Sequence, residues 1–211
     1  MDENYFRYYK PKALIVFILI FGTIINYVVN LLHSYLEEYG IHYIQYPTTT
    51  AILFLLIVYV NKKQWKRAPL KYMYNVPDVS GRYEGEVIFK NPIKKEIQTK
   101  NCALEVKQTG SKLKIDCYFE NEDKSENTLS NSLVESLIKN SNDTYSLVFT
   151  YNNNGNQVKN LTQHYGTNIL DFFENESGKY LKGIYYTNRE PNQTKGEMKL
   201  KYITNKLKNE Y

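Results

Sequence analysis

Residues 181–200 hold the side chains whose types and spacing are best suited to binding a nucleotide. Tyr185, Thr187 and Arg189 occupy every second position, so a strand would place all three on one face. A tyrosine ring can stack on a base, a hydroxyl can hydrogen-bond to it, and a guanidinium can form a forked contact with phosphate. The same spacing also occurs in an ordinary strand that ends in a solvated charge, so both interpretations stay open at this point.

Catalytic chemistry finds little support in the residue types. The chain has three histidines, His33, His42 and His164, and it lacks a glycine-rich phosphate loop, an HExxH motif and a GxSxG motif. Its two cysteines, Cys102 and Cys117, cannot form a four-cysteine zinc site, and we interpret both as small apolar residues. We therefore expect a protein that is not an enzyme and that has no catalytic residues, metal ion or resident cofactor.

The elements that would position these residues are strands. Apolar residues alternate in eight segments separated by turn residues, at Gly81–Lys90, Ile97–Thr109, Lys112–Asn121, Leu129–Lys139, Tyr145–Asn152, His164–Glu174, Lys179–Asn188 and Lys195–Ile203. About eight strands of about ten residues predict an all-β domain, an eight-stranded antiparallel up-and-down β-barrel. Such a barrel has no free sheet edge and is just wide enough to hold one small ligand. A two-sheet sandwich is the structural alternative.

Two uncharged apolar segments precede the strands, Ala13–Leu32 and Tyr43–Val60. A helix of about 20 residues is about 30 Å long, which is the thickness of a bilayer core, so each segment is predicted to be a transmembrane helix. The short connector between them indicates a hairpin. We predict a two-span transmembrane hairpin at 1–67, a linker at 68–77 and a cytoplasmic β-barrel ligand-sensing domain at 78–211.

Positive charge is concentrated beside the apolar segments. Residues 1–74 contain 8 Lys and Arg against 4 Asp and Glu, whereas residues 75–211 contain 19 against 18. Basic residues precede the first apolar segment and follow the second, whereas the connector between them contains two glutamates and no Lys or Arg. The positive-inside rule therefore places both chain ends in the cytoplasm. Because the larger soluble part is nearly neutral, we expect a lipid bilayer as a partner and no DNA or RNA polymer.

Gly22, Asn26 and Asn30 fall on one face of the first apolar segment, at intervals of four residues. Small and amide side chains are the ones that allow membrane helices to approach and hydrogen-bond to each other. Two interpretations remain open. The face could make a contact within the hairpin, or it could carry transmembrane association between copies of the chain.

Short motifs follow the two apolar segments in a recognisable order: Val76–Gly85 (VPDVSGRYEG), Lys107–Thr109 (KQT), the strand with Ser130 and Ser132, Phe149–Asn152 (FTYN), Gln163–Gly166 (QHYG), Gly183–Arg189 (GIYYTNR) and Thr194–Gly196 (TKG). This order resembles the SMODS-associating, two-transmembrane, beta-strand-rich effector family. These proteins are membrane effectors of bacterial cyclic-oligonucleotide-based anti-phage signalling (CBASS). Tyr83 stands where the family often has tryptophan.

The resemblance implies an activating ligand and a mode of action. The barrel would bind a cyclic di- or oligonucleotide second messenger, and binding would drive homo-oligomerisation. The transmembrane segments would then disrupt the bacterial inner membrane and cause abortive infection. On this hypothesis the ligand-binding residues are two cations for phosphate, Arg189 and Lys195; three rings that line the base pocket, Tyr83, Tyr151 and Tyr185; and three hydroxyls, Ser132, Thr187 and Thr194.

Two other classes of function remain as alternatives. One is a membrane-tethered, lipocalin-like barrel that binds an apolar small molecule, which predicts a lumen lined by aliphatic and phenylalanine side chains. The other is a module with a filled barrel that binds a protein partner and no small ligand.

Overall fold

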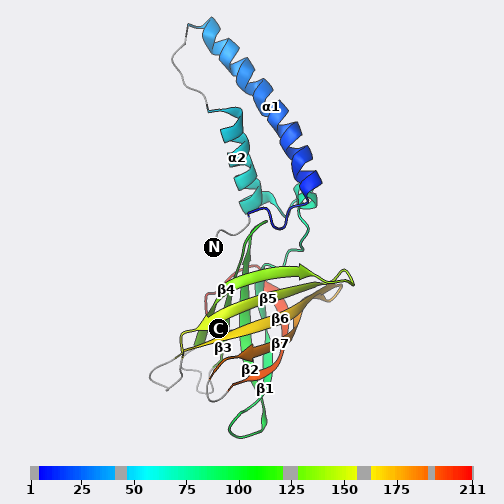
Figure 1. Cartoon of the computed structure of the whole chain (residues 1–211), viewed down its shortest axis with the longest axis vertical. Coiled ribbons are helices and arrows are strands. Elements are labelled where there is room, and N and C mark those ends of the chain that lie inside the picture. Colours follow the sequence, from blue (N-terminus) through cyan, green and yellow to red (C-terminus); the bar gives the residue numbers. More distant parts are fainter. Residues whose placement is uncertain (1–4, 41–46, 121–127, 156–162, 190–192, 211) are drawn as a thin grey trace. The chain divides into compact units, whose positions relative to one another are not determined.

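Figure 1 presents the computed structural model of the chain, which describes residues 5–40, 47–120, 128–155, 163–189 and 193–210. The chain forms two compact units, Met1–Asn75 with Thr109–Lys112, and Val76–Gln108 with Leu113–Tyr211. The predicted linker at 68–77 overlaps the boundary between these units, and its exact bounds remain a prediction.

The second unit is a closed barrel of eight antiparallel strands, in which each strand pairs with the next and β8 pairs with β1 (Figure 1). The strands are β1 (Gly81–Lys90), β2 (Ile97–Gln108), β3 (Leu113–Phe119), β4 (Thr128–Lys139), β5 (Tyr145–Asn153), β6 (His164–Asn175), β7 (Gly178–Thr187) and β8 (Lys195–Thr204). The predicted up-and-down barrel is therefore confirmed, and the sandwich alternative is wrong. Each strand begins and ends within two residues of its predicted bounds.

Alternating side chains divide each strand into a lumen face and an outer face. On β6 the buried residues are Gly166, Asn168, Leu170 and Phe172, and the residues between them are more exposed. The lumen core consists largely of aliphatic and aromatic side chains with no exposed surface, among them Tyr83, Leu104, Ile115, Leu147, Leu170 and Leu181. Burying a side chain of this size contributes about 1.5–3 kcal/mol, so this core is the main source of the barrel's stability.

Gly85 and Gly183 are two of the three barrel glycines at which neighbouring strands come unusually close; the third is Gly196. A Cβ built on Gly85 would lie 2.0 Å from the carbonyl oxygen of Lys199, and one on Gly183 would lie 2.0 Å from that of Ile169. No side chain fits at either distance, so both positions require glycine for the strands to bend around the lumen.

A buried ion pair lies on the outer face of the barrel. Nη1 of Arg82 donates to Oε1 of Glu105 at 2.8 Å, and the two side chains are 1% and 0% exposed. The C-terminal segment covers the pair, because the backbone N–H groups of Lys208 and Asn209 donate to the Glu105 carboxylate and Arg82 donates to the carbonyl oxygen of Glu210. The carboxylate is thus surrounded by donors, which offsets its removal from water.

The first unit begins with helix α1 (Pro11–Glu38), which has 28 residues and Pro11 in its first turn. Of the residues that the structure describes, α1 alone forms a helix long and apolar enough to cross a membrane. It contains the whole of the first predicted span. Helix α2 (Thr49–Tyr59), the π-helix η1 (Val60–Gln64) and the 3-10 helix η2 (Leu70–Met73) follow it.

The prediction of two transmembrane helices is wrong for the described part of the chain, which has one candidate. Within the predicted span Tyr43–Val60, the α-helix α2 has only 11 residues, a length of about 16 Å against a bilayer core of about 30 Å. The helix starts late because Thr48 is extended and acts as the N-cap, accepting a hydrogen bond from the N–H of Ala51 at 3.2 Å. Residues 43–46 of that span lie outside the described residues.

Two residues of the polar face of α1 meet α2 in the same chain. Oγ1 of Thr49 donates to Oδ1 of Asn26 at 3.3 Å. A Cβ on Gly22 would make ordinary contact with Leu53, at 3.8 Å. These contacts support the interpretation of a contact within the hairpin, and association between copies through Gly22, Asn26 and Asn30 stays a prediction.

A cluster of hydrogen-bonded side chains organises the rest of the first unit. The Tyr74 hydroxyl donates to the Tyr9 hydroxyl at 3.0 Å, and Oδ1 of Asn61 accepts from Tyr9 at 3.3 Å and from Ser111 at 2.8 Å. The indole of Trp65 is 3% exposed and packs edge-on against Tyr74, with 5.9 Å between ring centres. The cluster thereby links Tyr9, which precedes α1, and Tyr74, which follows η2, to Asn61 in η1.

Candidate functional site

The lumen contains a hollow of about 160 Å³ at the end of the barrel where β1, β5 and β7 finish. The lining side chains are Val87, Phe89, Lys100, Phe119, Glu120, Tyr151, Asn153, His164, Tyr185, Thr187, Arg189 and Thr194. They come from six strands and from the segments that follow β3 and β7. Closure of the sheet is what brings them together, since in the sequence they are spread over more than 100 residues.

Five of the eight residues predicted to bind a ligand line this hollow, namely Tyr151, Tyr185, Thr187, Arg189 and Thr194. The two threonines are in contact, with 3.1 Å between their Oγ1 atoms, and the N–H of Thr194 donates to Oγ1 of Thr187 at 3.2 Å. These bonds hold Thr194, the residue just before β8, against the end of β7, and Arg189 lines the same hollow.

The two tyrosine rings of the hollow are held by glycines on neighbouring strands. A Cβ on Gly166 would lie 2.3 Å from the ring of Tyr151, and one on Gly196 would lie 2.9 Å from the ring of Tyr185. Burial raises the pKa of Tyr185 to about 12 and also raises the pKa of Tyr151. Both side chains are therefore neutral phenols at physiological pH and can stack on, or hydrogen-bond to, a bound molecule.

Three side chains that could meet negative charge face the hollow, Lys100, His164 and Arg189, together with one acid, Glu120. Sequence reasoning missed Lys100 and His164 as binding residues. Lys100 shares its strand face with the buried residues Cys102 and Leu104. The alternation of apolar residues in β2 therefore indicates that the Lys100 side chain points into the lumen. Lys100 and Arg189 suit a phosphate, which accepts charge-assisted hydrogen bonds from such cations.

The three other predicted ligand residues lie elsewhere. Tyr83 is buried deeper in the lumen, where its hydroxyl donates to the carbonyl oxygen of Val79 at 3.0 Å. The Ser132 hydroxyl accepts from the N–H of Ile115 at 2.8 Å and donates to the carboxylate of Glu135. Lys195 is exposed on the outer face, in register with Tyr186. Their roles in binding stay predictions.

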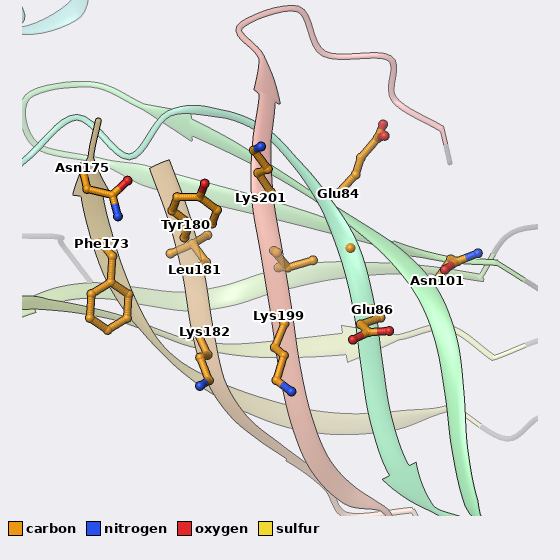
Figure 2. A pocket seen from close by; sticks show the side chains of 12 residues that line it. Glu84, Glu86, Asn101, Phe173, Asn175, Tyr180, Leu181, Lys182, Lys199 and Lys201 are labelled. Atoms are coloured by element: carbon orange, nitrogen blue, oxygen red, sulfur yellow. The ribbon is translucent and has the colours of Figure 1, made fainter. Parts of the chain in front are cut away.

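A larger hollow, of about 910 Å³, lies on the outer face of the barrel (Figure 2). Figure 2 shows its charged side chains along β7, β8 and β1: Lys182, Lys199, Lys201, Glu84 and Glu86. They alternate with the buried residues of the lumen face, and opposite charges stand side by side in the register of β1 and β8. Such a ladder is typical of a solvated sheet face.

The smaller hollow inside the lumen is the better candidate for specific binding. Rings, hydroxyls and cations converge there from several strands, which is the arrangement that fixes the orientation of a ligand. Within the described ranges, no group of three or more His, Cys, Asp or Glu side chains could hold a metal ion. The side chains that line the hollow offer ring surfaces, hydrogen bonds and charge to a bound molecule.

Comparison with known proteins gives one family. The family model described as "Cap15, cyclic dinucleotide receptor domain" matches residues 74–202, which is more than half of the chain and includes every strand except the last two residues of β8. No curated protein matches the chain at a significant level.

Proposed function

The chain belongs to the family of the Cap15 cyclic dinucleotide receptor domain, and from this premise we propose that its barrel is the sensor of a CBASS membrane effector. The resemblance drawn from the sequence is confirmed by this membership. The family is one of ligand-sensing receptor domains and is not a known catalytic family. The activating ligand that we propose is a cyclic dinucleotide or a related cyclic oligonucleotide.

The observation that carries the proposal is the convergence of groups suited to a nucleotide inside the lumen. Tyr151 and Tyr185 offer ring surfaces to a base, and the paired hydroxyls of Thr187 and Thr194 offer hydrogen bonds. Arg189 and Lys100 would meet the phosphates. Because the second unit as a whole is nearly neutral, affinity would come from these local groups and not from a broad positive field.

The size of the hollow suggests how binding becomes a signal. Its volume of about 160 Å³ is below the roughly 300–1,000 Å³ usual for small-molecule sites. A cyclic dinucleotide must therefore displace side chains at the opening, the Tyr151 ring among them. The ligand then binds an opened barrel better than the resting one, and this difference in affinity is what shifts the equilibrium between the two states.

The response that we propose takes place in the membrane. Helix α1 attaches the protein to the bacterial inner membrane, with the barrel on the cytoplasmic side where a nucleotide messenger is made. The opened state forms a homo-oligomer, and the apolar N-terminal segments of the assembled copies disrupt the bilayer. Loss of the membrane barrier kills the infected cell, which is the antiviral outcome called abortive infection.

The lumen lining separates this function from the alternatives. An apolar-ligand carrier predicts a lumen lined by aliphatic and phenylalanine side chains. The deeper lumen is largely aliphatic and aromatic, whereas the hollow at its end is lined by three basic side chains and several hydroxyls, which an apolar ligand would not use. A partner-binding module with a filled barrel is the second candidate, which the small volume of the hollow favours. The two differ in whether the barrel responds to a small molecule at all.

A thermal-shift experiment tests the proposal. The full chain, in detergent or nanodiscs, is melted with and without cyclic dinucleotides and trinucleotides. We expect at least one of them to raise the melting temperature by mass action on the folded state. A flat response across the whole set, with a folded protein, would favour the partner-binding module instead.

A further inference from the structure

Among the residues that the structure describes, one buried polar side chain of the lumen, that of Asn168, lacks a hydrogen-bond partner. Asn168 on β6 is 1% exposed. Within the described residues neither Nδ2 nor Oδ1 of its carboxamide has a hydrogen-bond partner. Asn153, another buried lumen asparagine, is bonded at both atoms, donating to Ser130 at 2.8 Å and accepting from the N–H of Gly155 at 2.9 Å. Buried amides are nearly always hydrogen-bonded, so the vacant donor and acceptor of Asn168 require an explanation.

The position of Asn168 connects it to the hollow. It shares the lumen face of β6 with His164, which lines the hollow, and with Gly166 between them. In the barrel register Asn168 lies between Phe149 on β5 and Tyr185 on β7. Its carboxamide is therefore one layer below the opening, next to a ring that borders the hollow.

The Tyr151 ring occupies the layer between the hollow and Asn168. The ring lies against Gly166, the residue on β6 that separates His164 from Asn168 on the lumen face. Because Gly166 has no side chain, a rotation of the Tyr151 ring would leave the space over Gly166 empty and open toward the Asn168 carboxamide. A flat molecule entering there would be flanked by Tyr185 and would reach both vacant atoms.

We infer that Asn168 reads the nucleobase of the ligand, with Nδ2 donating to and Oδ1 accepting from one edge of a base that enters the lumen past Tyr151. This inference rests on the proposed function. The chemistry requires a planar edge that carries an acceptor beside a donor, as in the contact of asparagine with the N7 and N6 atoms of adenine. Asn168 would thus set specificity, while Arg189 and Lys100 hold the phosphates without regard to the base.

The test uses Asn168→Leu, which has nearly the same shape and lacks the polar atoms. If the amide is kept for a ligand, removing it relieves a buried unpaired group, so the free protein should melt at the same temperature or higher. The melting shift caused by the best cyclic dinucleotide of the panel should be lost, and its affinity should fall about tenfold or more. Asn131→Leu is the matched control, because Asn131 donates to Asp116 at 2.8 Å on the outer face. We expect it to melt lower and to bind normally.

The possible outcomes distinguish a failure of the inference about Asn168 from a failure of the proposed function. If the wild-type chain binds a cyclic dinucleotide and Asn168→Leu binds it equally well, the inference about Asn168 is wrong and the proposed function stands. If Asn168→Leu melts lower than wild type and binds normally, a buried water satisfies the amide and its role is structural. If the wild type responds to no cyclic nucleotide, the proposed function itself fails. Should Asn168→Leu not fold, Asn168→Ala removes the same atoms without adding volume and is judged by the same affinity criterion.

Discussion

The ring of Tyr151 lies so close to Gly166 that a Cβ on the glycine would come within 2.3 Å of the ring's Cζ and Oη atoms. The two residues face each other in register on β5 and β6. The absence of a side chain at position 166 is therefore what gives the ring its place in the lumen.

Gly166→Ala is expected to push the Tyr151 ring out of this place. Crowding of a packed interior typically costs about 1–3 kcal/mol, so the variant should unfold at lower denaturant concentration and bind a cyclic dinucleotide with altered affinity. Chemical denaturation and a binding titration of the full chain measure the two effects. Ile169→Ala is the control, because Ile169 is on the outer face of the same strand. Wild-type stability and binding in Gly166→Ala would contradict the role given to the glycine.

Arg189 and Lys195 give a paired test of which cation meets the ligand. Arg189 borders the lumen hollow, whereas Lys195 is exposed on the outer face. A hydrogen bond from a charged group contributes about 1.5–3 kcal/mol, so Arg189→Ala should weaken binding at least about tenfold. Lys195→Ala should bind as the wild type does, although the sequence predicted a role for both. Isothermal titration of the two variants side by side measures the difference, and equal losses in both would refute the lumen site.

Glu105→Gln is expected to destabilise the barrel. The variant removes one charge of a pair in which Arg82 and Glu105 are 1% and 0% exposed. Breaking a buried pair from one side typically costs about 3–5 kcal/mol, since the remaining charge stays buried. Glu84→Gln removes the other acid bonded to Arg82, but its side chain is 33% exposed, so its cost should be smaller. Denaturant unfolding of both variants measures the order, and the reverse order would contradict the model of a desolvated pair held under the C-terminal segment.

The contact between Asn26 and Thr49 predicts coupled effects in the N-terminal unit. If the role of Asn26 is its hydrogen bond to Thr49 within one chain, Asn26→Leu and Thr49→Val should reduce the free energy of pairing between α1 and α2 to the same extent. The expected loss is about 0.6–1.7 kcal/mol. The double variant should then be no worse than either single one. Proteolysis of the full chain in nanodiscs reports on the pairing. Additive effects, accompanied by loss of toxicity in Asn26→Leu alone, would instead support association between copies.

The barrel was predictable because its physical signals are local. Alternation of apolar residues sets the face of each side chain, and turn residues set the ends of the strands. The prediction of the second membrane span was wrong, and the reason is also local. Hydropathy counts apolar residues, but it does not register that Thr48 is extended and starts the helix at Thr49.

The site could be predicted only in part, because it depends on register across the barrel. The shared face of Tyr185, Thr187 and Arg189 follows from spacing within one strand and its end. Lys195 comes after the segment that joins β7 to β8, and alternation cannot be carried across such a segment. The bulge next to Ser132 interrupts alternation in a similar way. The meeting of Lys100 and His164 depends on closure of the sheet, which no short stretch of sequence encodes.

The chain has a single tryptophan, and it lies in the first unit against Tyr74, while the barrel has none. Its fluorescence therefore reports on the N-terminal unit alone and is silent about the ligand's own contacts in the lumen. A change in Trp65 emission on adding a cyclic nucleotide would mean that an event in the barrel had reached the N-terminal unit. The molecule thus carries an optical probe of communication between its two units, with no label to attach.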